Sequence, residues 1–277
     1  MNRRQLLNFR KTLSGLLILM LFSSFPIQGQ VVVVVDKGLE GPALHGLRKL
    51  ELALQTKGHN VQHAEEVNNI QAEYLIVAGE FFSEGPAAKI IRAGGISMPD
   101  GPEALVVQKM EIQGIPSLVL CGSDGVGLMY AALDAADRIS WSGTGDDPFE
   151  QIMDTQEHPH MLDRAVSIYT MQRVRFENFL YDTMLLEQYF DMLAESRINS
   201  FVVIFGYENG GFMAPAYPYF FDVDEFPDVT LVGLDPDQQA RNTAAFKRLI
   251  RMAHQRGIRF CPAFWDHIYR GEVQGGG

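Results

Sequence analysis

Three predicted strands are each followed by polar and aromatic side chains of the types that enzymes place at strand ends. These side chains are Arg173 after the first strand, Tyr207, Glu208 and Asn209 after the second, and Trp265, Asp266 and His267 after the third. Arginine donates forked hydrogen bonds to hydroxyl or carboxylate oxygens. Aromatic faces cover the apolar faces of ligands, and a few polar groups beside them fix orientation. The pattern therefore predicts a binding site where these strands end.

Each of these groups also has a structural interpretation. Arg173 can pair with an acid on the surface, Glu208 can lie in solvent, and Trp265 can pack on a neighbouring loop that Asp266 caps. The long loop 206–234 contains further aromatic residues, for which packing within the loop is the alternative to ligand binding. They are Tyr217, Tyr219, Phe220 and Phe221.

Motifs for several other chemistries are absent from the sequence. The segment GSDGVG (122–127) lacks the spacing of phosphate and dinucleotide loops, so it is interpreted as a turn and a helix start. His158 and His160 have no third metal ligand nearby. No GxSxG motif or catalytic cysteine arrangement is present. We therefore expect no metal and no cofactor, and the catalytic residues stay unknown at this stage.

The elements that would position the candidate site form two groups. Residues 30–140 alternate strand and helix patterns, from VVVVV (31–35) to the helical pattern of 127–139, and predict a small accessory α/β domain. Residues 141–162 are rich in Gly, Asp, Pro and His without a period, and are interpreted as a linker. Residues 163–277 then repeat strand and helix patterns.

The second group, residues 163–277, has the predicted element order β-α-β-α-β. Its strands, at 164–170, 201–205 and 258–264, are apolar throughout, as parallel strands covered by helices tend to be. The helix 184–196 is expected to be capped by Asp182 or Thr183, and the next helix by Asp235. Two folds fit this order, a doubly wound sheet or the start of a (β/α)8 TIM barrel.

The amino terminus predicts export. Residues 1–29 combine four basic residues with the apolar run LSGLLILMLF, which is typical of a cleaved signal peptide. An uncleaved anchor is the alternative; after cleavage we expect no membrane span and a periplasmic or extracellular protein. The net charge of -11 argues against a nucleic-acid partner. Cys121 and Cys261 are expected to be buried free thiols, with a disulfide between them, which export would permit, as the alternative.

Two segments resemble one class of glycoside hydrolase. CGSDGVGLMYAALDAADRI, followed by a linker and DRAVSIYTMQR, is similar to the β-N-acetylhexosaminidase (family 20) and α-glucuronidase (family 67) group. These enzymes place a small α/β domain before a catalytic (β/α)8 barrel. The resemblance implies that Arg164 binds a sugar hydroxyl. The stretch GYENGGF differs from the His- and Asp-rich stretch that hexosaminidases carry after the second strand.

The resemblance implies a carbohydrate substrate and hydrolysis by a carboxyl pair. A barrel has eight strands, and the resemblance places the catalytic carboxylates at or beyond the fourth. Because only three barrel strands are predicted, we expect a truncated barrel, the amino-terminal fragment of an exported glycoside hydrolase. The alternative is a non-catalytic exported carbohydrate-binding protein, which would bind sugars without this missing part. The sequence does not predict the oligomeric state.

Overall fold

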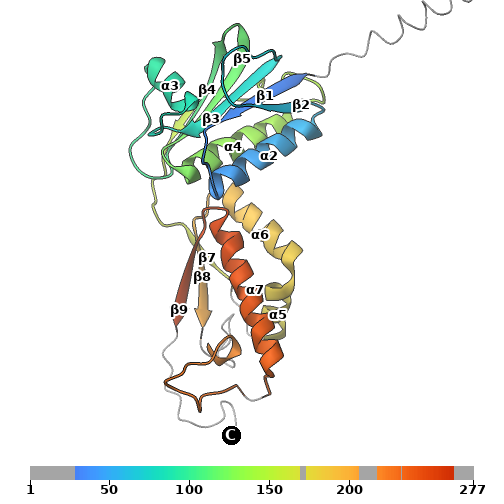
Figure 1. Ribbon diagram of the computed structural model, residues 1–277, viewed down its shortest axis with the longest axis vertical. Coiled ribbons are helices and arrows are strands. Elements are labelled where there is room, and N and C mark those ends of the chain that lie inside the picture. The colour runs from blue at the N-terminus through green and yellow to red at the C-terminus, as the bar shows by residue number, and fades with distance from the viewer. Residues whose placement is uncertain (1–28, 169–172, 206–216, 232, 265–277) are drawn as a thin grey trace, which may run out of the picture.

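The computed structural model describes residues 29–168, 173–205, 217–231 and 233–264. In this part of the chain two β-sheets, each with its own helices, follow one another along the sequence (Figure 1). This confirms the predicted α/β class, whereas the truncated barrel stays a prediction. No helix within these ranges is long and apolar enough to cross a membrane.

The first sheet contains six strands. They are β1 (Gln30–Val35), β2 (Asn60–Ala64), β3 (Tyr74–Glu80), β4 (Leu105–Ile112), β5 (Ile115–Gly122) and β6 (Thr155–Glu157). Their order is β2-β1-β3-β5-β4-β6, with β1, β2, β3 and β5 parallel. Strands β4 and β5, which contain the apolar runs LVV (105–107) and LVLC (118–121), form an antiparallel hairpin. Its turn has positive φ at Gln113 and Gly114, as tight two-residue hairpin loops require.

Helices cover both faces of this sheet. Helices α2 (Pro42–Thr56) and α4 (Gly125–Trp141) lie side by side on one face, and α3 (Pro86–Ala93) lies on the other (Figure 1). In β1, Val31 and Val33 pack in the cluster with α2 and α4, whereas Val32 and Val34 pack in the cluster with α3. Burial on both faces explains why this strand is apolar from Val31 to Val35.

The segment 141–162 is more than the linker that the sequence analysis expects. Strand β6 lies within it and pairs with β4, and the side chains of Phe149 and Ile152 are buried in the core of the first sheet. The linker interpretation was wrong for this part because two isolated apolar residues create no periodic pattern. We call residues 29–157 the N-terminal unit.

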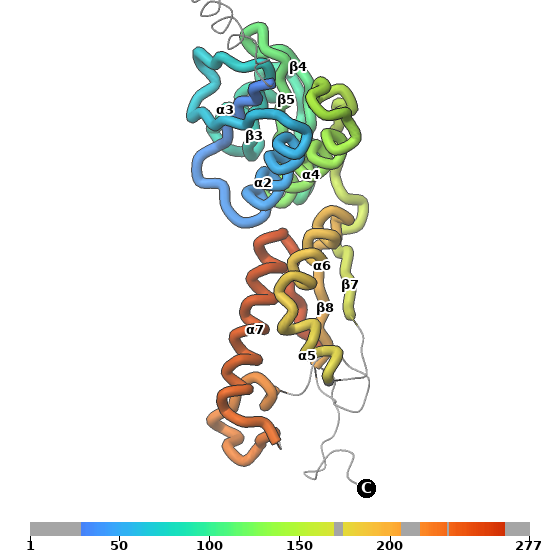
Figure 2. The backbone as a smooth tube through the Cα atoms, turned by 90° about the vertical axis from the view of Figure 1, so that its right-hand side faces the viewer, coloured from blue at the N-terminus to red at the C-terminus, as the bar shows by residue number. Residues whose placement is uncertain are grey.

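The second sheet contains three parallel strands in the order β7-β8-β9. Its elements are β7 (Ala165–Ser167), α5 (Arg173–Tyr181), α6 (Thr183–Glu195), β8 (Ser200–Phe205), a 3-10 turn (Tyr217–Tyr219), α7 (Pro236–His254) and β9 (Arg259–Phe264). The helices lie on one side of the sheet (Figures 1 and 2). Between them lies a core that includes Phe176, Phe190, Phe201 and Leu249. We call the described residues from 163 to 264 the C-terminal unit.

Helix starts in the C-terminal unit follow the predicted caps. The Asp182 carboxylate accepts from the backbone N–H of Leu185, and the Asp235 carboxylate accepts from that of Gln238. Helix α5 was not predicted. The amino ends of β7, β8 and β9 face the N-terminal unit, and their carboxyl ends point away from it (Figure 1).

Candidate functional site

The predicted ligand site lies at the carboxyl ends of β7, β8 and β9. These strands are parallel, so their carboxyl ends meet at one edge of the sheet, far from the N-terminal unit (Figure 1). The described chain includes the first residue of α5, Arg173, but not the position of its side chain. The other six predicted residues lie outside the described residues, and their roles stay predictions: Tyr207, Glu208, Asn209, Trp265, Asp266 and His267.

Two aromatic residues in the described part of the loop, Tyr219 and Phe220, pack into the core. Tyr219 is fully buried and Phe220 is 4% exposed. The Tyr219 hydroxyl donates to the Glu177 carboxylate at 2.7 Å, and its carbonyl oxygen accepts from Asn242 at 2.9 Å. Loop packing, the structural alternative, therefore holds for Tyr219 and Phe220. Phe221 is mostly exposed.

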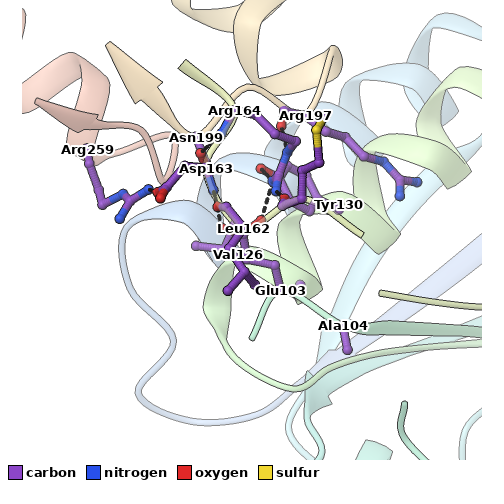
Figure 3. Close-up of polar contacts among 12 residues, drawn as sticks. Glu103, Ala104, Val126, Tyr130, Leu162, Asp163, Arg164, Arg197, Asn199 and Arg259 are labelled. Carbon is purple, nitrogen blue, oxygen red and sulfur yellow. Dashed lines mark hydrogen bonds and ion pairs between the residues drawn. The ribbon is translucent and has the colours of Figure 1, made fainter. Parts of the chain in front are cut away.

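Arg164 lies at the amino end of β7, where the two units meet (Figure 3). Its guanidinium donates to the Glu103 carboxylate, to the carbonyl oxygen of Met161 at 2.6 Å and to that of Arg197 at 2.5 Å. Only 13% of the Arg164 side chain is exposed. A sugar would displace these contacts, so the geometry favours a unit-joining role, and sugar binding by Arg164 stays a prediction.

Glu103 is the centre of this junction, and no sequence pattern indicated it. Its Oε2 accepts from Arg164, and its Oε1 accepts from the Asn199 side chain at 2.8 Å. The Asn199 side chain also donates to the Leu162 carbonyl at 2.7 Å and accepts from the backbone N–H of Arg164 at 2.9 Å. One carboxylate of the N-terminal unit thus holds the start of β7 and the residue before β8 (Figure 3).

A second arginine packs on the same junction. The guanidinium of Arg197 lies over the Tyr130 ring, 5.6 Å from its centroid, and donates to Glu157 at 2.8 Å. Burial raises the pKa of Tyr130 to about 12, and the Glu103 carboxylate adds to this shift. Burial opposes the charge of Arg164, but hydrogen bonds to Glu103 and Tyr130 outweigh it and raise the pKa of Arg164. Both groups therefore keep their proton near neutral pH.

The segment GSDGVG holds Glu103 in place. Asp124 caps α4 by accepting from the backbone N–H groups of Val126 and Gly127, and it also accepts from that of Glu103 at 2.9 Å. A Cβ at Gly127 would lie 2.2 Å from the carbonyl oxygen of Ala104, so only glycine allows this close approach. The predicted turn and helix start is confirmed, and it positions the junction.

A small polar pocket of about 240 Å³ lies beside this junction. Its wall comes from both units and includes Lys49, Tyr130, Asp137, Glu195 and Arg197. Among the described residues, no three His, Cys, Asp or Glu side chains are grouped so that they would hold a metal ion. Cys121 and Cys261 are both unpaired, as predicted; Cys121 is buried and Cys261 partly buried. Burial raises the pKa of the Cys121 thiol to about 12, so it is not a reactive thiolate.

Solved structures with a similar fold are glycoside hydrolases. A GH138 enzyme, described as targeting pectin rhamnogalacturonan II, matches 86% of this chain with a TM-score of 0.63 and 19% identity. The GH84 protein CpGH84D matches 88% of this chain with a TM-score of 0.53 and 12% identity. No protein-family profile and no curated protein sequence matches this chain.

These comparisons show a glycoside hydrolase-like fold. The chain covers 32% of the GH138 enzyme and 36% of CpGH84D, which is about a third of each. The match extends over most of this chain, so it includes residues of both units. At these identities the likeness concerns the fold alone, and neither the family 20 nor the family 67 grouping is confirmed.

Proposed function

We propose that this chain forms the amino-terminal part of an exported glycoside hydrolase. In this proposal the N-terminal unit is an accessory α/β domain, and the C-terminal unit contributes the first three β/α units of a (β/α)8 barrel. The observation that carries the proposal is the fold match to a GH138 enzyme over 86% of the chain. The resemblance of CGSDGVGLMYAALDAADRI and DRAVSIYTMQR to the family 20 and family 67 group supports the same class of reaction.

Among the described residues, no helix covers the other face of the second sheet (Figure 1), and the side chains on that face support a barrel. On β8, Phe201, Val203 and Phe205 enter the core below the helices, whereas Val202 and Ile204 point to the other face and are half-buried. Cys261 of β9 aligns with Val202 in register. Small and branched side chains of this kind fill the interior of (β/α)8 barrels.

The substrate would bind at the carboxyl edge of the second sheet, where barrel enzymes place their active sites. Trp265 would cover one face of a sugar ring, and Asp266 and His267 would bind its hydroxyl groups. Glu208, which follows β8 in the sequence, would also bind sugar hydroxyl groups. None of these residues is assigned as the acid or the nucleophile, because that pair follows later strands in enzymes of this resemblance.

The proposal predicts hydrolysis by the product of the complete gene. A substrate panel would contain N-acetylhexosaminides, glucuronosides and rhamnogalacturonan II oligosaccharides, with reducing ends as the readout. We expect Trp265→Ala and Asp266→Asn to lower kcat/KM by about 10- to 100-fold, because each removes an interaction with the substrate. Asp237→Asn, in the first turn of α7, should stay within about twofold of the unchanged enzyme.

Two results would contradict this proposal. If the Trp265 and Asp266 variants hydrolyse the substrate as fast as the unchanged enzyme, these residues do not belong to the site. Sugar binding by calorimetry without any hydrolysis across the panel would instead support an exported carbohydrate-binding protein.

A further inference from the structure

A second contact between the units is centred on Asp191 of α6. The Asp191 carboxylate accepts from Lys49 of α2 at 2.6 Å and from Arg256, which follows α7, at 2.5 Å. Ala194, one turn further along α6, is buried in the core cluster of the N-terminal unit. Helix α6 is therefore docked on α2 and α4 through a charged pair and a small apolar contact.

His45 lies inside this contact without a hydrogen bond at its Nε2. The side chain is on α2, and His45 as a whole is 6% exposed. Its Nε2 is buried, has no hydrogen-bond partner in the described residues, and lies 3.6 Å from the Asp191 carboxylate. A neutral imidazole tolerates this position, whereas a charged imidazolium would be shielded from water and would face a carboxylate that already accepts from Lys49 and Arg256.

The groups around His45 disfavour its protonation. Arg48 and Lys49 lie on its own helix, Arg256 reaches it from the end of α7, and Asp191 faces it from α6. Burial is the main cause that lowers the pKa of His45 to about 4; the cations act in the same direction, and Asp191 alone opposes them. Since Asp191 already binds Lys49 and Arg256, its charge is largely compensated.

We propose that protonation of His45 opens the Asp191 contact between the units. The contact is closed while the imidazole is neutral and opens when the imidazole takes up a proton. The two contacts between the units would respond differently to acid. The Asp191 contact opens, and the Glu103 contact, which contains no histidine, keeps the units joined. Opening would rotate the C-terminal unit about the Glu103 junction. The proposal concerns the two described units and does not rest on glycosidase activity.

The direction of the pH effect follows from proton linkage. The closed state holds His45 with a pKa of about 4, and a solvated histidine has an ordinary value of 6.5. The open state therefore binds the proton more tightly. Closure is fully favoured above pH 6.5 and weakens as the pH falls, by up to about tenfold for each pH unit, until the closed-state pKa is reached.

The first test compares the full chain with His45→Gln, which stays neutral at every pH. Small-angle scattering from about pH 7.5 to about pH 4.5 would report the separation of the units. We expect the unchanged chain to expand as the pH falls, and His45→Gln to stay compact over the pH range in which His45 takes up its proton. The matched control is His63→Gln: His63 is an exposed histidine beside Glu51, and its removal should leave the profile unchanged.

A second measurement keeps the proposal testable where His45→Gln does not fold. Histidine-labelled chain would be titrated by NMR, with the His45 resonance followed directly. A His45 pKa above the ordinary histidine value would mean that imidazolium pairs with Asp191, and this would overturn the proposal. Identical expansion of the unchanged chain and His45→Gln would overturn it as well.

Discussion

Replacing Glu103 with alanine will lower the free energy of unfolding of the chain by about 3 kcal/mol, because it leaves a buried arginine without its carboxylate. The side chains of Arg164 and Glu103 are 13% and 15% exposed, so solvent replaces the lost contact poorly. The Asn199 amide loses one of its two acceptors at the same time and keeps the Leu162 carbonyl. Urea unfolding followed by circular dichroism at neutral pH would measure the change.

The control for this prediction is Glu66→Ala, which removes an exposed carboxylate of the N-terminal unit. It should change the unfolding free energy by less than about 0.5 kcal/mol. The double variant Glu103→Ala, Arg164→Ala should recover part of the loss, because the unpaired charge is removed with its partner. If Glu103→Ala unfolds at the same urea concentration as Glu66→Ala, Glu103 does not join the units as described.

Replacing Gly127 with alanine will destabilise the N-terminal unit by about 3 kcal/mol, since the added methyl group meets the backbone. The new Cβ would lie 2.2 Å from the Ala104 carbonyl oxygen, and that carbonyl already accepts from the backbone N–H of Ser123 at 2.8 Å. Neither group can move without breaking the turn that presents Glu103. We therefore expect Gly127→Ala to weaken the junction as well as the fold.

Gly125→Ala is a matched control two residues earlier in the same helix. Its Cβ would have no neighbour closer than 3.4 Å, which is ordinary contact. Because alanine favours a helix over glycine, this change should be neutral or stabilise by up to about 1 kcal/mol. Thermal unfolding of both variants would decide the matter: equal melting temperatures would show that the approach of Gly127 to Ala104 is unimportant.

Local patterns in the sequence were sufficient for most elements. The hairpin of β4 and β5 follows from two apolar runs around a short Gly-containing turn, and the starts of α6 and α7 follow from Asp182 and Asp235 as caps. Strand β1 could be predicted from VVVVV (31–35), because a strand that is buried on both faces is apolar without alternation. These features depend on residues that lie close together in the chain, so a short stretch of the sequence contains their physical cause.

Two of the features that were missed, strand β6 and the partner of Arg164, depend on distant residues. Strand β6 exists because β4 offers it an edge, and nothing within 141–162 signals that pairing. The resemblance suggested a sugar-binding Arg164 because it compares residue types along a strand, and it does not show which carboxylate is nearby. In the structure Arg164 pairs with Glu103, 61 residues away, on a loop where Glu103 has a φ of +60°.

The sequence by itself therefore determined the α/β class, the positions of most strands along the chain and most helix ends. Only the tertiary structure decided how the units join, because burial and charge pairing arise where separate segments meet. The Glu103–Arg164 pair and the buried His45 imidazole beside Asp191 exist only once α2, α4, α6 and the start of β7 are brought together.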